Sequence, residues 1–232
     1  MPYEDNPFEK KQVAEEWITS VEREEGMIRD REIYPMLENW VEEINPQLVV
    51  EIGSGQGICS DKLGDYKGSY VGVEPSEHLV QRANNIYPDK RRRFIIGNAY
   101  HLPLTTEVAD AGFSVNVWFH LESLSQASAE LARVLKPEGH YLIVTANPDA
   151  EEIWDSFYFD KTNQDKVIRG KVNVPVIPLS DSTFYKHSLV EIIQALEAVG
   201  LSVEETKIFG INENLPKPIF LAVLGRKVSP QA

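Results

Sequence analysis

The chain has 232 residues, 42% of them hydrophobic, and a formal net charge of −13 at pH 7. This length accommodates one sizeable α/β core and is too short for two full domains. Charged residues from Glu4 onward speak against a signal peptide, and no apolar run approaches the roughly 20 residues that a membrane helix needs. The single cysteine, Cys59, excludes an internal disulfide. These features predict one domain (1–232) in the cytoplasm.

The excess of acids limits the choice of partners. Residues 1–50 contain 13 acids and 5 bases, so more than half of the net charge lies there. A polyanion such as RNA or DNA would be repelled by that part of the chain. One basic run, Lys90–Arg93, precedes a predicted strand, and we interpret it as a solvated loop in preference to a nucleic-acid patch.

Two amphipathic helices open the chain. In each helix the apolar residues recur at helical spacing on one face. They are Val13, Trp17, Ile18 and Val21 in the first helix, and Ile33, Leu37, Trp40, Val41 and Ile44 in the second. Asn45-Pro46 ends this segment. We therefore predict a helical cap over residues 1–46, which packs on the core and can also serve as a lid.

A strand and a glycine loop follow. In Leu48–Ile52 every residue except Glu51 is apolar, as is typical of a buried strand in a parallel sheet. Gly53, Gly55 and Gly57 then predict a turn tight enough for backbone N–H groups to face a ligand. The next strand, Tyr70–Glu74, ends in a carboxylate, where nucleoside-binding doubly wound folds hold a ribose diol.

The spacing of the loop separates two classes of ligand. The pattern is G-x-G-x-G, and Ile58 stands where a dinucleotide fingerprint needs its third glycine, which speaks against a nicotinamide dehydrogenase. Glu51, two residues before Gly53, would repel a pyrophosphate and suits a cationic amino-acid group. Alternatively, Glu51 has a structural role as an acid at the end of a strand that caps a helix. The loop with Glu51 resembles motif I of the class I S-adenosylmethionine-dependent methyltransferases.

Later segments resemble the same family in the expected order. Arg93–Leu104 is similar to its third-strand segment, Ala109–Leu121 to the fourth strand with its loop, and Glu130–Thr145 to a helix, a Pro-Glu-Gly turn and the fifth strand. The resemblance covers residues 45–146. It implies an α/β fold with a Rossmann-like, doubly wound, seven-stranded sheet, mostly parallel with a C-terminal antiparallel hairpin. It also implies S-adenosylmethionine as cofactor and S-adenosylhomocysteine as product.

The resemblance assigns cofactor contacts to this chain. Glu74 would accept from the ribose hydroxyls, Glu51 would lie near the ammonium, and Asn116 beside the sulfonium. Asn98 stands where the family usually has Asp, and its carbonyl can still accept from the adenine amine. The full expected set is Glu51, Gly53, Ser54, Gly55, Gly57, Glu74, Pro75, Asn98, Ala99 and Asn116.

Methyl transfer needs few catalytic side chains, because positioning and a dry pocket supply most of the acceleration. His120, just past the fourth strand, is the candidate general base, and a hydrogen-bonded structural histidine is its alternative. The candidate substrate residues are Trp118, Tyr158, Tyr185 and His187. The histidines show no metal-ligand spacing, so we predict an enzyme without a metal.

The remaining chain completes the domain. Residues 47–146 form the predicted cofactor-binding core, and residues 147–187, rich in aromatics without a clear period, are interpreted as a substrate cover. In residues 188–232, Ser188 starts a helix with a capping box and Gly200 follows its end. Leu201–Ile208 and Ile219–Leu224 are the predicted closing strands.

These observations favour a methyltransferase that acts on a nitrogen or oxygen of a small molecule. Two alternatives remain open: a methyltransferase of protein or RNA, and a silent protein that binds S-adenosylmethionine. The sequence leaves the oligomeric state undetermined.

Overall fold

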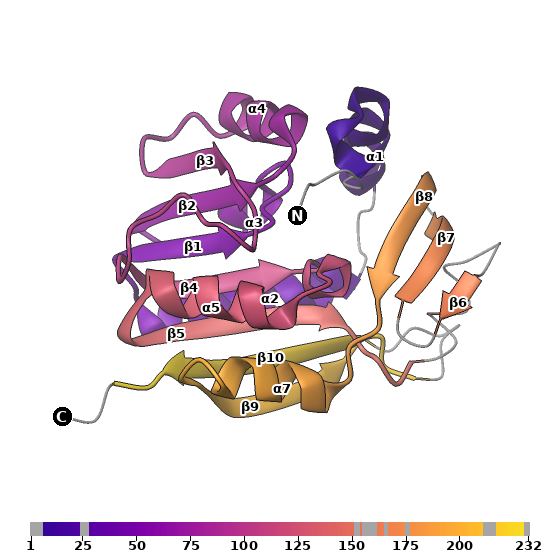
Figure 1. Cartoon of the computed structure of the whole chain (residues 1–232). Helices are drawn as coiled ribbons and strands as arrows, with labels where there is room; N and C mark the ends of the chain where they lie inside the picture. Colours follow the sequence, from indigo (N-terminus) through magenta and orange to yellow (C-terminus); the bar gives the residue numbers. More distant parts are fainter. Residues whose placement is uncertain are drawn as a thin grey trace.

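The computed structural model describes residues 7–23, 28–150, 154, 162–164, 167–174, 177–210 and 217–229. Its main sheet has seven strands in the order β3-β2-β1-β4-β5-β10-β9 (Figure 1). The pairs from β3 to β5 are parallel, and β10 is antiparallel to both β5 and β9. The predicted fold class is therefore confirmed. The strands are β1 (Leu48–Ile52), β2 (Ser69–Glu74), β3 (Arg92–Ile96), β4 (Ala109–Val115), β5 (Leu135–Ala146), β9 (Leu201–Phe209) and β10 (Phe220–Lys227).

Helices cover both faces of this sheet (Figure 1). One apolar core joins the sheet to η2 (Arg29–Ile33), α2 (Tyr34–Ile44), α3 (Ile58–Asp61) and α4 (Glu77–Ile86). A second core, on the other face, includes residues of η3 (Trp118–His120), α5 (Leu124–Val134) and α7 (Leu189–Glu197). The apolar run of β1 serves both cores: Val49 belongs to the first and Val50 to the second. This two-sided burial explains why β1 reads as continuous.

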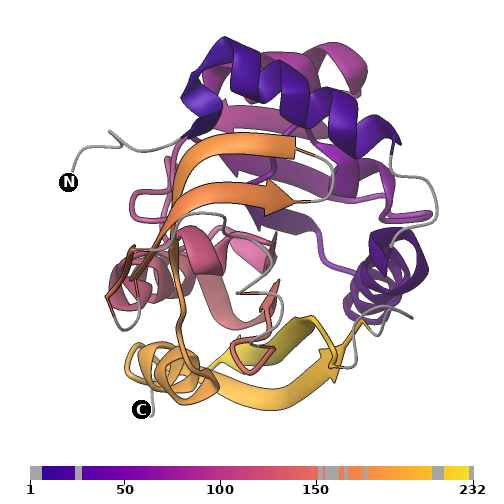
Figure 2. The same ribbon diagram turned by 90° about the vertical axis from the view of Figure 1, so that its right-hand side faces the viewer.

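The two predicted N-terminal helices have different places. Leu37, Trp40 and Val41 of α2 are buried in the first core. The segment η1 (Pro7–Glu9) and α1 (Lys11–Arg23) instead lies against α4 and beside strand β8 of a second sheet (Figure 2). The Ser76 hydroxyl donates to the Phe8 carbonyl at 2.6 Å and so fastens η1 to the start of α4.

The predicted cover contains strands that the sequence analysis did not identify. β6 (Thr162–Gln164), β7 (Val167–Val174) and β8 (Ile177–Tyr185) form an antiparallel sheet of three strands. In Figure 2 this sheet lies in front of the edge where the parallel strands end, next to α1. β8 contacts both α1 and η3. The cover therefore stands over the carboxyl edge of the main sheet.

Local signals placed most boundaries correctly, with one difference. Asn45 ends α2 with φ 47°, Ser76 caps α4, and Ser188 forms a capping box. β5, however, begins at Leu135, so the predicted Pro-Glu-Gly turn lies inside the strand. Glu138 has φ 60°, and its carboxylate accepts from the backbone and hydroxyl of Ser229. This tertiary contact holds the irregular backbone within the strand.

Candidate functional site

The candidate site lies at the carboxyl ends of β1, β2 and β4, where open α/β sheets bind ligands. The loop after β1 is anchored to β2 by backbone bonds. The N–H groups of Gly53 and Ser54 donate to the Val73 carbonyl at 2.7 and 3.2 Å, and Gly55 N donates to Glu74 Oε2 at 3.0 Å. The loop is thus held in one conformation beside the acid that ends β2.

The three glycines of the loop have positive φ angles and different surroundings. An added Cβ would lie 2.3 Å from Val117 Cγ2 at Gly53 and 2.6 Å from the Phe94 ring at Gly57. At Gly55 a Cβ would meet nothing within 4 Å. The backbone of Gly55 therefore offers open space for a ligand, whereas Gly53 and Gly57 allow the loop to pack against the core.

Glu74 is oriented by its neighbours. Its side chain is 5% exposed, with Oε1 accepting from Ser76 N at 3.0 Å and Oε2 from Gly55 N at 3.0 Å. Burial raises its pKa to about 7, against the opposing effect of these two N–H groups. Each carboxylate oxygen can accept more than one hydrogen bond. Glu74 thus fits the two hydroxyls of a ribose.

Glu51 lies on the face of the sheet that packs against α2 and α3. It is 2% exposed, and its Oε2 accepts from the Tyr70 hydroxyl. The Cys59 thiol lies beside the same carboxyl group. Burial raises the pKa of Glu51 to about 7, although the neighbouring Tyr70 hydroxyl and Cys59 thiol lower it. Neither partner was foreseen, because the sequence does not show which side chains meet beneath the loop.

These two carboxyl groups predict a pH dependence of stability. Their pKa rises from 4.5 to about 7 on folding, so the folded protein binds more protons between these values. The contribution of each group to the free energy of unfolding should therefore fall by about 3 kcal/mol as pH rises from about 4.5 to 7, while the buried imidazole of His120 contributes in the opposite direction.

Urea denaturation of the wild type and of Glu74→Gln between pH 5 and 8 tests this dependence. The neutral amide removes one titrating group, so the gap between the two proteins should change with pH. A constant gap would contradict the prediction.

Asn98 and Ala99 lie in a tight loop after β3. Asn98 Oδ1 accepts from Tyr100 N at 2.8 Å, an Asx turn that uses one of its lone pairs. Glu130 and Arg133 of α5 hold the end of this loop through the backbone N–H and carbonyl of Leu102, at 2.7 and 2.9 Å. The adenine contact expected of Asn98 would have to use its second lone pair. Pro75 is half-buried between Glu74 and the start of α4.

Two side-chain amides at the site contain buried polar atoms without a hydrogen-bond partner. Asn116, at the end of β4, has φ 59°, and its Oδ1 accepts no hydrogen bond in the structure. Gln56, inside the glycine loop, is 3% exposed with both amide atoms unpaired. Buried polar atoms normally have partners. The sequence analysis missed Gln56, because a variable position of a glycine loop carries no signal of its burial.

The segment after β4 turns Trp118 into the core and leaves His120 half-buried. Trp118 is 2% exposed and packs with Leu121 and Leu124. The substrate contact expected of Trp118 stays a prediction. The half-buried His120 ring packs on Phe119 and Phe184, with centroids 4.3 and 4.8 Å apart.

Burial also decides the charge of His120. It lowers the pKa of the imidazole to about 4, so the ring is neutral at pH 7. General bases act best when their pKa lies near the working pH. His120 can therefore accept a hydrogen bond but is a weak base.

Tyr185 is the last residue of β8, and His187 follows the strand. Their rings are stacked, 6.1 Å apart and 12° from parallel, and His187 Nε2 lies 2.6 Å from the Leu121 carbonyl. A carbonyl only accepts, so Nε2 carries the proton and donates it. His187 thus ties the end of the cover to the loop after η3. Tyr158 lies outside the described residues.

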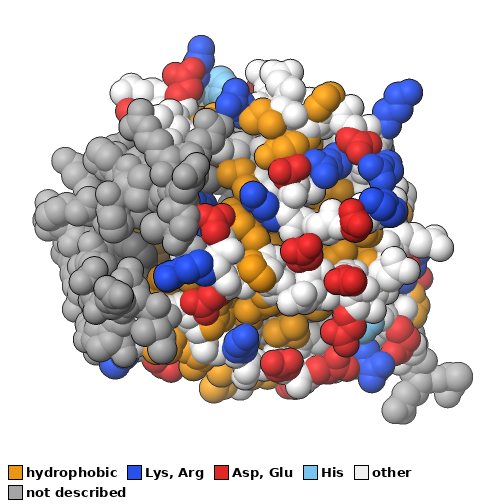
Figure 3. Space-filling model, turned by 180° about the vertical axis from the view of Figure 1, so that it is seen from behind, with side chains coloured by type: hydrophobic (Ala, Val, Ile, Leu, Met, Phe, Trp, Pro, Cys, Tyr) orange, Lys and Arg blue, Asp and Glu red, His pale blue; other side chains and the backbone are white. Residues whose placement is uncertain are grey.

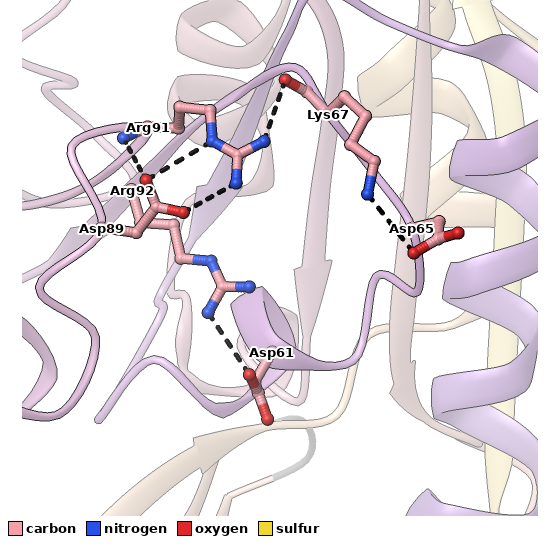
Figure 4. A network of polar contacts seen from close by, with 6 residues as sticks. All are labelled: Asp61, Asp65, Lys67, Asp89, Arg91 and Arg92. Carbon is pink, nitrogen blue, oxygen red and sulfur yellow. Dashed lines mark hydrogen bonds and ion pairs between the residues drawn. The ribbon is translucent and has the colours of Figure 1, made fainter.

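The basic run is paired in part with acids. Arg91 bonds to Asp89 at 2.8 Å and Arg92 to Asp61 at 3.3 Å, close to the pair of Lys67 and Asp65 (Figure 4). On the back of the molecule, acidic and basic side chains intermingle over the described surface (Figure 3). In the part of the chain that the structure describes, no cluster of three metal-binding side chains occurs, and no helix is long and apolar enough to cross a membrane.

Known proteins resemble this chain over the same region. A family model described as "Methyltransferase domain" matches residues 50–143. A sterol 24-C-methyltransferase of Schizosaccharomyces pombe is 28% identical over 96 residues, which are 39% of this chain and 25% of that protein. An uncharacterized methyltransferase of Bacillus subtilis is 28% identical over 112 residues, 47% of this chain and 44% of that protein. The chain thus spans less than half the length of these curated relatives.

The fold extends further than the sequence similarity. The crystal structure of a SAM-dependent methyltransferase from Methanosarcina mazei superposes with a TM-score of 0.70 at 15% identity. The superposition covers 85% of this chain and 99% of that one. At this level of identity the likeness concerns the fold.

Proposed function

We propose that this chain is a class I S-adenosylmethionine-dependent methyltransferase and that it methylates a nitrogen or oxygen atom of a small molecule without a metal. Residues 50–143, which match a family model described as a methyltransferase domain, support the proposal. The observation that carries the proposal is Glu74, a buried carboxylate already aligned by Gly55 and Ser76 at the end of β2. We also place this activity in the cytoplasm, where the buried thiol of Cys59 stays reduced.

The residues of the site fit the cofactor. Glu74 would accept from the ribose, the open backbone at Gly55 would approach the amino-acid end, and the unpaired Asn116 Oδ1 would face the sulfonium. When bound, S-adenosylmethionine supplies a methyl group on a positively charged sulfur, which a nucleophile displaces in line. The chain's own contribution is to hold the reactants and to exclude water.

The state of His120 favours one kind of acceptor. A neutral imidazole with a pKa of about 4 can orient an N–H or O–H group but takes up its proton poorly. An amine in its uncharged form attacks with its lone pair and loses a proton to water only afterwards, so the attack itself needs no base. Amines are therefore the first acceptors to test, and hydroxyl compounds the second.

The test has two parts. Calorimetric titration with S-adenosylhomocysteine should show binding, and incubation with S-adenosylmethionine and a panel of small amines and hydroxyl compounds should yield products heavier by one methyl group. Binding without any methylated product would support a silent binding protein instead. If a protein or an RNA added to the same assay were methylated, the acceptor would be a macromolecule and not a small molecule.

A further inference from the structure

Three buried side chains from three elements meet beneath the glycine loop. Glu51 is the penultimate residue of β1, Cys59 is in the first turn of α3, and Tyr70 is in β2. The Tyr70 hydroxyl donates to Glu51 Oε2, and the Cys59 thiol lies beside the same carboxyl group. Tyr70 is only 2% exposed, so water does not replace this bond.

The positions of Glu51 and Cys59 along the chain place these contacts at the two ends of the glycine loop. Glu51 lies two residues before Gly53, and Cys59 two residues after Gly57. The Glu51 carboxyl and the Cys59 thiol thus come from the two ends of the loop and lie side by side beneath it. Tyr70 connects this pair of side chains to β2, the strand whose Glu74 binds the middle of the loop at Gly55.

The ring of Tyr70 supports the same loop from below. It packs on Phe94, with centroids 5.5 Å apart, and the Phe94 ring is the group that a Cβ on Gly57 would meet. Loss of the hydroxyl alone would leave this packing in place. The contribution of the hydrogen bond can thus be separated from that of the ring.

We propose that Tyr70 is a positioning residue for the glycine loop: through its hydroxyl, and together with the Cys59 thiol, it holds the Glu51 carboxyl beneath the ends of the loop, where that group favours the cationic end of the cofactor. The inference rests on the proposed function. It adds Tyr70 and Cys59, which touch no ligand themselves, to the residues that determine cofactor affinity.

The groups around Glu51 determine whether its pKa rises or falls when the Tyr70 hydroxyl is removed. Glu74 raises the pKa of Glu51, whereas the Tyr70 hydroxyl and the Cys59 thiol lower it. Two further groups interact electrostatically with this cluster: Tyr34 of α2 with Glu51 and Cys59, and Arg29 of η2 with Cys59. Removal of the Tyr70 hydroxyl should therefore raise the pKa of Glu51 further. At pH 7 more of the protein would then carry an uncharged Glu51.

The experiment compares Tyr70→Phe with Tyr141→Phe. Tyr141 is equally buried, and its hydroxyl donates to the Ser202 carbonyl at 2.9 Å, between β5 and β9. Each variant loses one buried hydrogen bond, so similar losses of stability are expected. S-adenosylhomocysteine is titrated into the wild type and both variants between pH 6 and 9.

We expect Tyr70→Phe to bind about tenfold more weakly at pH 7 and to recover affinity at higher pH. Tyr141→Phe should bind like the wild type at every pH. Equal affinities of the two variants would overturn the positioning role while leaving the proposed function intact. Failure of the wild type to bind would overturn both.

A second pair of variants covers the case that Tyr70→Phe does not fold. Cys59→Ser keeps a donor beside Glu51, and Cys59→Ala removes it. Weaker binding by Cys59→Ala than by Cys59→Ser supports the same arrangement, and equal binding by the two speaks against it.

Discussion

Replacement of Glu74 by alanine should weaken the binding of S-adenosylhomocysteine at least about 100-fold, because two hydrogen bonds to a charged acceptor are lost at about 1.5–3 kcal/mol each. The substitution also leaves Gly55 N and Ser76 N without their acceptor. The loop and the start of α4 would thus lose the group that aligns them. Calorimetric titration measures the effect.

Glu77→Ala is the matched control for this prediction. Glu77 lies three residues further along, is exposed, and bonds only to Gln81 among the contacts of its side chain that the structure describes. Its replacement should leave the affinity unchanged. Binding by Glu74→Ala within a few-fold of the wild type would show that the ribose is held elsewhere.

Gly53→Ala should destabilise the protein by about 3 kcal/mol or more, because strain and overlap add together at this position. Gly53 has φ 73°, where a side chain is strained, and its Cβ would lie 2.3 Å from Val117 Cγ2. To relieve the overlap, either Val117 or the whole loop must move. Urea denaturation gives the loss of stability, and titration gives the accompanying loss of affinity.

Two further variants separate strain from overlap. Gly200→Ala has a similar φ of 80° with nothing within 4 Å, so it reports the strain alone, about 1 kcal/mol. The double variant Gly53→Ala with Val117→Ala removes the overlapping methyl groups and should recover part of the stability. A loss at Gly53 no larger than at Gly200 would contradict the packing of the loop against Val117.

The sequence was most informative where a local pattern decides the structure. The apolar run of β1, the glycine spacing and the acid that ends β2 are each recognisable within ten residues, and the structure brings them together at one edge of the sheet. The cap at Ser188 was predicted for the same reason. In each case a short-range hydrogen bond or turn fixes the conformation.

Contacts between distant segments could not be predicted in this way. The helical period that placed α1 and α2 does not tell which of them packs on the sheet and which on the cover. Trp118 follows a strand that ends at the site, and only the turn of η3 into the core reveals its burial. Tyr70 likewise reads as one more apolar position of a buried strand, and its bond to Glu51 depends on the pairing of two strands.

Ser76 connects events at two places of the molecule. Its backbone N–H holds Glu74, and its hydroxyl holds the carbonyl of Phe8 ahead of α1. We therefore expect ligand binding at Glu74 and attachment of residues 7–23 to be linked equilibria, in which whatever strengthens one strengthens the other by the same factor. A loaded protein should accordingly protect its N-terminal segment from proteases, and the loss of that segment should shorten the residence time of the nucleoside.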